Sequence, residues 1–179
     1  LIVTYTAPSQ AAKTAFRFTN LGGAEGLKST YVMKLLQDRQ GFLWIATQDG
    51  LYRYDGYHFK TFKHNPLDPT SLASNYVQHL FQDSQGIMWI STPHGGLSQY
   101  HPEFVNFSNY IHQAHDPDSL SYDLVLAVDE DQNHDLWIAT FGGGLNRFNR
   151  SDGTFSHFRH DPNDPNSLSD DNVYSILVD

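Results

Sequence analysis

The chain has 179 residues, of which 39% are hydrophobic and 14% aromatic, and its formal net charge at pH 7 is −9. This composition argues for a folded chain and against disorder, and the acidic balance without clustered Lys and Arg argues against nucleic acid as a partner. Cysteine is absent, which excludes a structural disulfide and a thiolate metal site and fits either the cytoplasm or a bacterial periplasm.

The first 15 residues, LIVTYTAPSQAAKTA, start apolar and pass into small residues. That order matches the end of a signal peptide and its cleavage region, and a disordered stalk or a truncated strand is the alternative. We expect residues 1–15 to be the remnant of a signal peptide or a stalk. Nowhere does the chain reach the ~18 consecutive apolar residues of a membrane span, so we expect contact with a membrane only through the parent protein.

Most of the chain is a repeated unit. The segments LWIATQDGLYRYDG, MWISTPHGGLSQYH and LWIATFGGGLNRFN begin at Leu43, Met88 and Leu136, and their tryptophans lie 45 and 48 residues apart. Nearly the same intervals separate Val32, Val77, Val125 and Val173. Periods of this length are typical of arrays whose units bury their faces against their neighbours.

In the unit that begins at Val32, four short runs occupy residues 32–38, 42–47, 51–55 and 58–64, with glycine-containing turns between them. Their aromatic and β-branched side chains predict antiparallel strands joined by tight turns. Four such strands make one blade of a β-propeller. A helical repeat is excluded because glycine recurs too often for an apolar stripe of helical period.

The sequence therefore predicts an all-β chain that forms a partial β-propeller with about three four-stranded antiparallel blades. Residues 16–26 are predicted to be an orphan outer strand and loop, in which 16–19 would pair with the last blade of the complete ring. Blades 1, 2 and 3 are expected at residues 27–71, 72–119 and 120–167, and residues 168–179 are expected to start a further blade with its first strand. Open sheet edges favour association, and a homodimer is one predicted arrangement.

Several repeated positions have structural explanations. The repeated tryptophans are expected to pack between adjacent blades: Trp44, Trp89 and Trp137. Asp38 and Asp83 each stand three residues before a turn glycine, so we expect their carboxylates to accept backbone N–H groups while the glycine adopts a positive φ. In the third copy His134 replaces that glycine, which predicts a looser hairpin or one of another type.

The pattern V-x5-D-x2-G-x-x-W-I-x-T, followed by G-L and an aromatic residue, resembles the two-component regulator propeller repeat over residues 27–179. That family is found in the periplasmic sensor regions of bacterial hybrid histidine kinases and of some membrane-bound diguanylate cyclases. The resemblance implies a ring of about seven blades, so that further blades of the same chain would be partners of this segment. It also implies a periplasmic location, in the extracytoplasmic part of an inner-membrane protein.

In such a propeller, the turn between strands two and three and the connection to the next blade share one face, here called the top face. The other turns lie on the opposite face, the underside. Underside turns repeat closely, whereas top-face positions vary from copy to copy, as expected of a binding face on a repeated scaffold. We therefore predict ligand-binding residues in the top-face loops: Gln48, Asp49, Asn75, Tyr76, His94, Tyr122, Asp123, Phe141 and Asn172.

The connections between blades, HNPLDPTSL, HQAHDPDSL and HDPNDPNSL, are unusually uniform and each begins with a histidine. A shared metal ion is not expected, because facing sheets lie ~10 Å apart whereas zinc ligands must all come within ~2.1 Å of the ion. We expect instead a Pro-stiffened turn in which Asp and Ser cap backbone groups. The leucines that end these motifs would fill the blade junctions: Leu72, Leu120 and Leu168.

No catalytic motif is recognisable: the chain has no G-x-S-x-G, no phosphate-binding loop before a helix and no H-E-x-x-H. We expect no enzymatic activity and no cofactor. Two functional hypotheses are left. The first is an extracytoplasmic sensor segment of a bacterial transmembrane signalling protein that binds a small molecule or an oligosaccharide at the top face. The alternative is a scaffold for protein interaction or dimerisation without a small ligand.

Overall fold

The computed structural model describes residues 20–178. The predicted signal-peptide or stalk remnant at 1–15 and the predicted orphan strand at 16–19 lie outside the described residues. Within the described part, the strands form three four-stranded antiparallel sheets, each ordered as in the chain. The prediction of an all-β chain with four-stranded blades is therefore confirmed. In the same part of the chain, we find no helix long and apolar enough to cross a membrane.

Each sheet is one blade. Blade 1 contains β1 (Val32–Gln37), β2 (Leu43–Thr47), β3 (Gly50–Tyr54) and β4 (Phe59–Phe62). Blade 2 contains β5 (His79–Gln82), β6 (Met88–Thr92), β7 (Gly96–His101) and β8 (Asn106–Tyr110). Blade 3 contains β9 (Val125–Glu130), β10 (Leu136–Thr140), β11 (Gly144–Asn149) and β12 (Thr154–Phe158).

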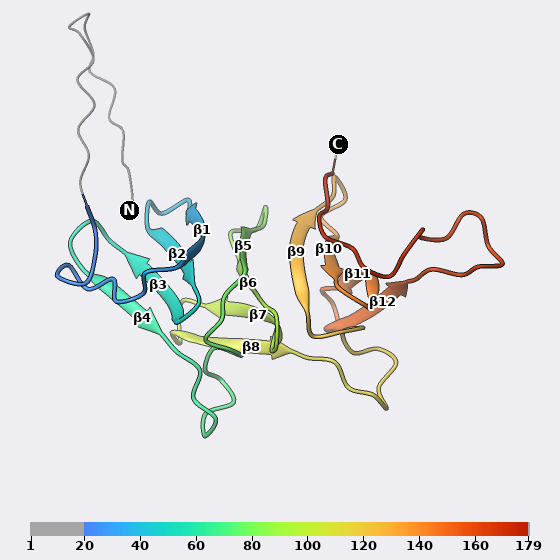
Figure 1. Cartoon of the computed structure of the whole chain (residues 1–179), viewed down its shortest axis with the longest axis horizontal. Coiled ribbons are helices and arrows are strands. Elements are labelled where there is room, and N and C mark those ends of the chain that lie inside the picture. Colours follow the sequence, from blue (N-terminus) through green and yellow to red (C-terminus); the bar gives the residue numbers. More distant parts are fainter. Residues whose placement is uncertain (1–19, 179) are drawn as a thin grey trace, which may run out of the picture.

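The three blades fan out side by side (Figure 1). The first strands of the blades meet, since β1 contacts β5 and β5 contacts β9, and β9 also packs against β6. The fourth strands β4, β8 and β12 lie at the outer edge of the fan, where long connections lead from one blade to the next (Figure 1). Chain order thus becomes spatial order, as in other repeat proteins.

The first strand of a further blade, expected within residues 168–179, stays a prediction. Residues 173–178 adopt no regular strand. The segment is held at its start by an isolated bridge between Phe141 and Asn172 and by a hydrogen bond from Val173 N to Thr140 O, 3.0 Å. A strand needs a partner for its backbone groups, and among the described residues Val173 is the last whose N–H donates to a backbone carbonyl.

The core lies between the blades. Trp44 is 2% exposed and packs on Phe62 of its own blade and edge-on against Tyr100 of blade 2, with ring centroids 5.0 Å apart. Trp89 contacts Phe148 of blade 3 in the same way, at 5.3 Å. Packing of these two tryptophans between blades is thereby confirmed, and each buried ring adds a large apolar area to its junction.

The conserved spacing of Asp and Trp within the repeat has a second cause that the sequence analysis missed. In the β1–β2 turn, Asp38 Oδ1 accepts hydrogen bonds from the N–H groups of Gln40 and Phe42, both 2.9 Å, as predicted. Its other oxygen accepts the indole N–H of Trp44 at 2.7 Å. The same indole–carboxylate bond joins Trp89 to Asp83 and Trp137 to Asp131, both at 2.9 Å. The turn therefore orients the ring that fills the blade junction.

The prediction of a looser or different hairpin at His134 is wrong. His134 has φ 67°, in the left-handed region that the turn glycines also occupy. Its N–H donates to Asp131 O at 2.9 Å, as Gly86 N–H donates to Asp83 O at 3.0 Å, so the turns are of one type. The side chain is held in place by a hydrogen bond between its Nδ1 and Ser84 Oγ, 2.9 Å. This contact with blade 2 offsets the backbone strain of ~1–2 kcal/mol that a residue other than glycine carries there.

The connections between blades are held by one repeated set of hydrogen bonds. His64 Nδ1 lies 2.9 Å from Leu72 O, and the corresponding distances are 2.8 Å from His112 to Leu120 and 2.7 Å from His160 to Leu168. Leu72 and Leu120 are fully buried. In the same loops, serine and aspartate side chains accept backbone N–H groups. The predicted stiffened turn is confirmed, and these histidines have a structural partner.

Candidate functional site

The topology separates two faces, as expected. On the top face, the β2–β3 turn contacts the β4–β5 connection through a hydrogen bond from Gly50 N to Asn75 O, 2.6 Å. Gly96 N donates to Asp123 O at 3.1 Å at the next junction. On the underside, the β1–β2 turn contacts the end of β5 and the β5–β6 turn, since Arg39 N donates to Gln82 Oε1 at 3.0 Å and Arg39 Nη1 donates to Ser84 O at 2.6 Å. Each face is therefore continuous across the blade junctions.

At the first top-face junction, two of the four predicted ligand residues have partners within the fold. The side-chain oxygen of Asn75 accepts the backbone N–H of His64 at 2.8 Å, which closes the connection. Asp49 forms an ion pair with Lys63. Gln48 is exposed and Tyr76 is half-buried. The side chains of Gln48 and Tyr76 are thus the ones that a ligand can reach here without breaking a contact of the fold.

At the second junction, three predicted residues line one cavity. His94, Tyr122 and Asp123 share a hollow of about 330 Å³ with Pro93, His112 and Leu124. His94 is exposed and Tyr122 is 47% exposed. The Asp123 carboxylate accepts the His112 backbone N–H at 2.6 Å, as Asn75 does in the preceding connection. This cavity is the best-defined top-face site in the described part of the chain.

The third group does not line that cavity, although the Phe141 N–H donates at 2.9 Å to the backbone oxygen of Leu124, which does. Phe141 forms an edge-to-face contact with Tyr174, with ring centroids 5.4 Å apart, and bridges Asn172 through the backbone. Asn172 is exposed. The predicted residues are thus distributed over three neighbouring junctions, and their role in binding stays a prediction. Among the described residues, we find no group of three or more His, Asp or Glu side chains placed to hold a metal ion.

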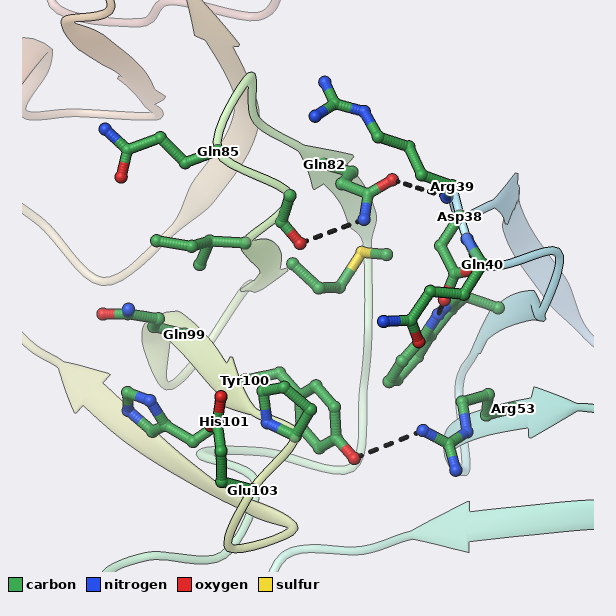
Figure 2. A pocket seen from close by; sticks show the side chains of 15 residues that line it. Asp38, Arg39, Gln40, Arg53, Gln82, Gln85, Gln99, Tyr100, His101 and Glu103 are labelled. Carbon is green, nitrogen blue, oxygen red and sulfur yellow. Dashed lines mark hydrogen bonds between the residues drawn. The ribbon is translucent and has the colours of Figure 1, made fainter.

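The underside carries a cavity that the sequence analysis missed. It has a volume of about 440 Å³ and opens between blades 1 and 2 (Figure 2). Its walls come from the β1–β2, β5–β6 and β7–β8 turns and from β3 and β7. We call it the underside cleft. The expectation that underside turns repeat closely is wrong for the turn between the third and fourth strands, which reads DGYH in blade 1, PEFV in blade 2 and RSDG in blade 3. This variation was the available signal.

The rings of Trp44 and Tyr100 and the side chains of two arginines, Arg39 and Arg53, line the underside cleft. The Arg53 guanidinium lies 4.4 Å from the centre of the Phe42 ring and 5.7 Å from that of Trp44. Its Nη1 donates to Tyr100 Oη at 3.4 Å, across the blade junction (Figure 2). Burial raises the pKa of the Tyr100 hydroxyl, which therefore stays neutral at physiological pH.

The equivalent junction between blades 2 and 3 is crossed by an ion-pair network, beside a smaller cavity of about 380 Å³ that Arg150 also lines. Arg150, from the β11–β12 turn, donates to Asp83 and to Glu130, each at 2.9 Å. The side chain of Asp83 is completely buried and that of Glu130 is 9% exposed. Ser84 donates its N–H and its hydroxyl to Glu130 at 2.6 and 2.9 Å. We call this group of side chains the Arg150 network.

Comparisons with known proteins agree with the repeat. Residues 26–49 and 71–94 match the family model described as Two component regulator propeller. Histidine kinase P4 from Formosa agariphila is 38% identical over 64 residues, which are 36% of this chain and 5% of that protein. The extracellular domain of the hybrid two component system BT3049 from B. thetaiotaomicron has a TM-score of 0.77 at 29% identity, over 88% of this chain and 22% of that one.

A more distant structure shares the fold alone. Virginiamycin B lyase from Staphylococcus aureus has a TM-score of 0.54 at 16% identity, over 74% of this chain and 42% of that one. The chain spans about a fifth of the BT3049 domain and a twentieth of the kinase. The resemblance to the two-component regulator propeller repeat first noted in the sequence is confirmed at residues 26–49 and 71–94, and the blades match the fold of the BT3049 domain.

Proposed function

We propose that this chain is part of the extracytoplasmic, ligand-binding sensor propeller of a bacterial transmembrane signalling protein. The observation that carries the proposal is the likeness to the extracellular domain of BT3049, at 29% identity over 88% of this chain. The match to a histidine kinase supports the same assignment. In this function the segment binds a ligand and transmits the signal without catalysing a reaction. It resides in the periplasm as part of a membrane protein.

The top-face cavity at His94, Tyr122 and Asp123 is the proposed ligand site, for a small molecule or an oligosaccharide. Its 330 Å³ lie within the ~300–1,000 Å³ usual for small-ligand pockets. Tyr122 offers a half-exposed ring for stacking, and His94 offers a polar group. A ligand that contacts residues of two blades would favour one arrangement of these blades, and this differential affinity is what shifts a signalling equilibrium.

The test is a thermal-shift screen of monosaccharides, oligosaccharides and small metabolites, followed by titration calorimetry of the compounds that bind. Tyr122→Ala is expected to weaken binding about 10-fold or more, since a buried stacking contact contributes about 1.5 kcal/mol. Tyr57→Ala is the matched control, because Tyr57 is 85% exposed in an underside turn. Compounds whose affinity is the same in wild type and Tyr122→Ala would refute the top-face site.

The alternative function is a protein-interaction or dimerisation scaffold. It is favoured by exposed apolar side chains at and near β1, where Tyr31 is 66%, Met33 36% and Leu35 41% exposed. Sedimentation of the wild type and of Leu35→Glu distinguishes the two functions. A dimer that dissociates in the variant, together with a screen in which no compound binds, would favour the scaffold.

A further inference from the structure

The two blade junctions differ at one equivalent position of the underside. The β7–β8 turn is closed by a hydrogen bond from Val105 N to His101 O, 2.8 Å, and the β11–β12 turn by one from Gly153 N to Asn149 O, 2.9 Å. In both turns the residue at the closing N–H has a positive φ. The turns are therefore superposable, and Pro102 occupies in blade 2 the position that Arg150 occupies in blade 3.

Between blades 2 and 3, the chain supplies its own cation. Arg150 reaches the buried carboxylate of Asp83, whose Oδ2 also accepts the Trp89 indole N–H. Between blades 1 and 2, Asp38 has the same turn contacts and the same indole bond, from Trp44. Pro102 has no side-chain donor, and in the described part of the chain no Lys, Arg or His forms an ion pair with Asp38. The Asp38 carboxylate faces the underside cleft instead.

In the same cleft, which Arg39 and Glu103 also line, the Arg53 guanidinium has no ion-pair partner among the described residues. The guanidinium of Arg53 contacts the rings of Phe42 and Trp44, and its one hydrogen bond goes to Tyr100 Oη. Among residues 20–178, no carboxylate lies within ion-pair distance of it. In blade 2 the equivalent residue is Gln99, which also lines the cleft. A half-buried guanidinium normally forms bidentate bonds to a carboxylate or phosphate.

We infer that the underside cleft binds a small zwitterion. The cationic end of the ligand, a guanidinium or ammonium group, takes the place at Asp38 that Arg150 takes at Asp83. The carboxylate end binds the Arg53 guanidinium. A cavity of 440 Å³ accommodates a molecule of the size of an amino acid or a dipeptide, and the side-chain amides of Gln40, Gln85 and Gln99 provide neutral hydrogen-bonding groups.

The arrangement of the walls makes this ligand a link between two blades. Asp38 and Arg53 belong to blade 1, whereas Gln99 and Tyr100 come from β7 of blade 2, and Figure 2 shows these side chains around the same cavity. A bound zwitterion would hold junction 1–2 as the Arg150 network holds junction 2–3. This site is separate from the top-face site and does not depend on it.

The experiment uses L-arginine as the zwitterion and agmatine, which lacks the carboxylate, as the matched probe. Binding to the full chain is measured by titration calorimetry. Arg53→Gln copies the residue of blade 2, and Pro102→Arg introduces the guanidinium of blade 3. We expect L-arginine to bind the wild type ~10-fold or more tightly than agmatine, because a charge-assisted hydrogen bond is lost without the carboxylate.

The two variants test the contacts of the carboxylate end and of the cationic end of the ligand one at a time. Arg53→Gln is expected to lower the affinity for L-arginine to that for agmatine and to leave agmatine unchanged. Pro102→Arg is expected to abolish binding of both, because its own guanidinium occupies Asp38. Circular dichroism checks that each variant is folded, and Tyr122→Ala should bind L-arginine as the wild type does. The proposal is overturned if wild type does not bind L-arginine at millimolar concentration, or if Arg53→Gln binds it unchanged.

Discussion

A single aspartate in each blade joins the local turn to the packing between blades. One carboxylate oxygen accepts two backbone N–H groups, and the other accepts the indole N–H of the tryptophan six residues later, as at Asp83 and Trp89. At Asp131 the Trp137 indole N–H is the main reason why the pKa of the carboxyl lies below its usual value. Glutamate could not make both sets of contacts, because its longer side chain would displace the turn.

His79 is the residue whose burial has the clearest consequence for pH. It lies on β5, its Nδ1 is buried, and in the described structure this atom has no hydrogen-bond partner. Burial lowers the pKa of the imidazole from 6.5 to about 4, and Lys34 contributes to the shift, while Asp129 opposes it. The charged form is disfavoured in the folded state, so the ring is neutral there at physiological pH.

Stability is therefore expected to fall on acidification through His79. Between pH 6.5 and 4 the unfolded chain binds a proton at this position and the folded chain does not, so the free energy of unfolding decreases as pH falls and this contribution is complete near pH 4. With allowance for partial solvent screening, the free energy of unfolding is expected to fall by about 1–2 kcal/mol over this range. Urea unfolding at several pH values measures it.

His79→Gln is expected to flatten the pH dependence over the same range. His58→Gln is the control, because the His58 side chain is 88% exposed, and it should leave the slope as in wild type. An equal slope in wild type and His79→Gln would contradict the assignment.

At the level of elements, the two blade junctions are built alike in their apolar parts and differently in their polar parts. Both contain a buried tryptophan that contacts an aromatic ring of the next blade. Only the junction between blades 2 and 3 contains the Arg150 network. Because Asp83 is completely buried, removal of its cation leaves a desolvated charge without its ion-pair partner.

Arg150→Ala is expected to lower the free energy of unfolding by about 3 kcal/mol, the lower end of the range for a broken buried ion pair, since Asp83 keeps its bonds to Trp89 and to the turn. Arg147→Ala provides the matched control. Arg147 forms an exposed pair with Asp135 at 3.7 Å, and its loss should cost less than about 1 kcal/mol. Equal effects of the two substitutions in chemical denaturation would show that the network adds nothing to stability.

At the scale of the whole molecule, we expect the local stability of each blade to depend on its contacts with the adjacent blade, since each blade contacts only its neighbours. The two first strands β1 and β9 both lie at a sheet edge, but four of the six side chains of β1 are exposed and none of those of β9. Glu130 at the end of β9 also belongs to the Arg150 network. The third blade should therefore open less often than the first.

Hydrogen exchange followed by mass spectrometry tests this order. Backbone amides of β9 are expected to exchange roughly 10–100-fold more slowly than those of β1, because local opening of β9 must also break the Arg150 network. Arg150→Ala should bring the exchange of β9 close to that of β1 and leave β1 unchanged. If β1 and β9 exchange at equal rates in the wild type, the junctions do not control local stability.

The sequence alone determined the repeat, the class of the fold and the position of most strands. These follow from local patterns, because glycine at the turns and aromatic and β-branched runs between them specify strands and hairpins within one blade. The packing of Trp44 and Trp89, the Asp turns and the stiffened connections could also be predicted, because each recurs at the period of the repeat. The resemblance to regulator propeller repeats follows from the same positions.

Only the tertiary structure decided what lies between the blades. Asp83 and Arg150 are 67 positions apart and Arg53 and Tyr100 are 47 apart, and each pair meets only because neighbouring blades pack against each other on the underside. His134 keeps the glycine type of turn because Ser84 of the neighbouring blade holds it. The position of Asn75 and Asp123 varies in the repeat, as expected of ligand-binding residues. Their side-chain oxygens nevertheless accept backbone N–H groups of the connections between blades. A repeat pattern specifies each blade, whereas the contents of a junction depend on side chains that two blades bring together.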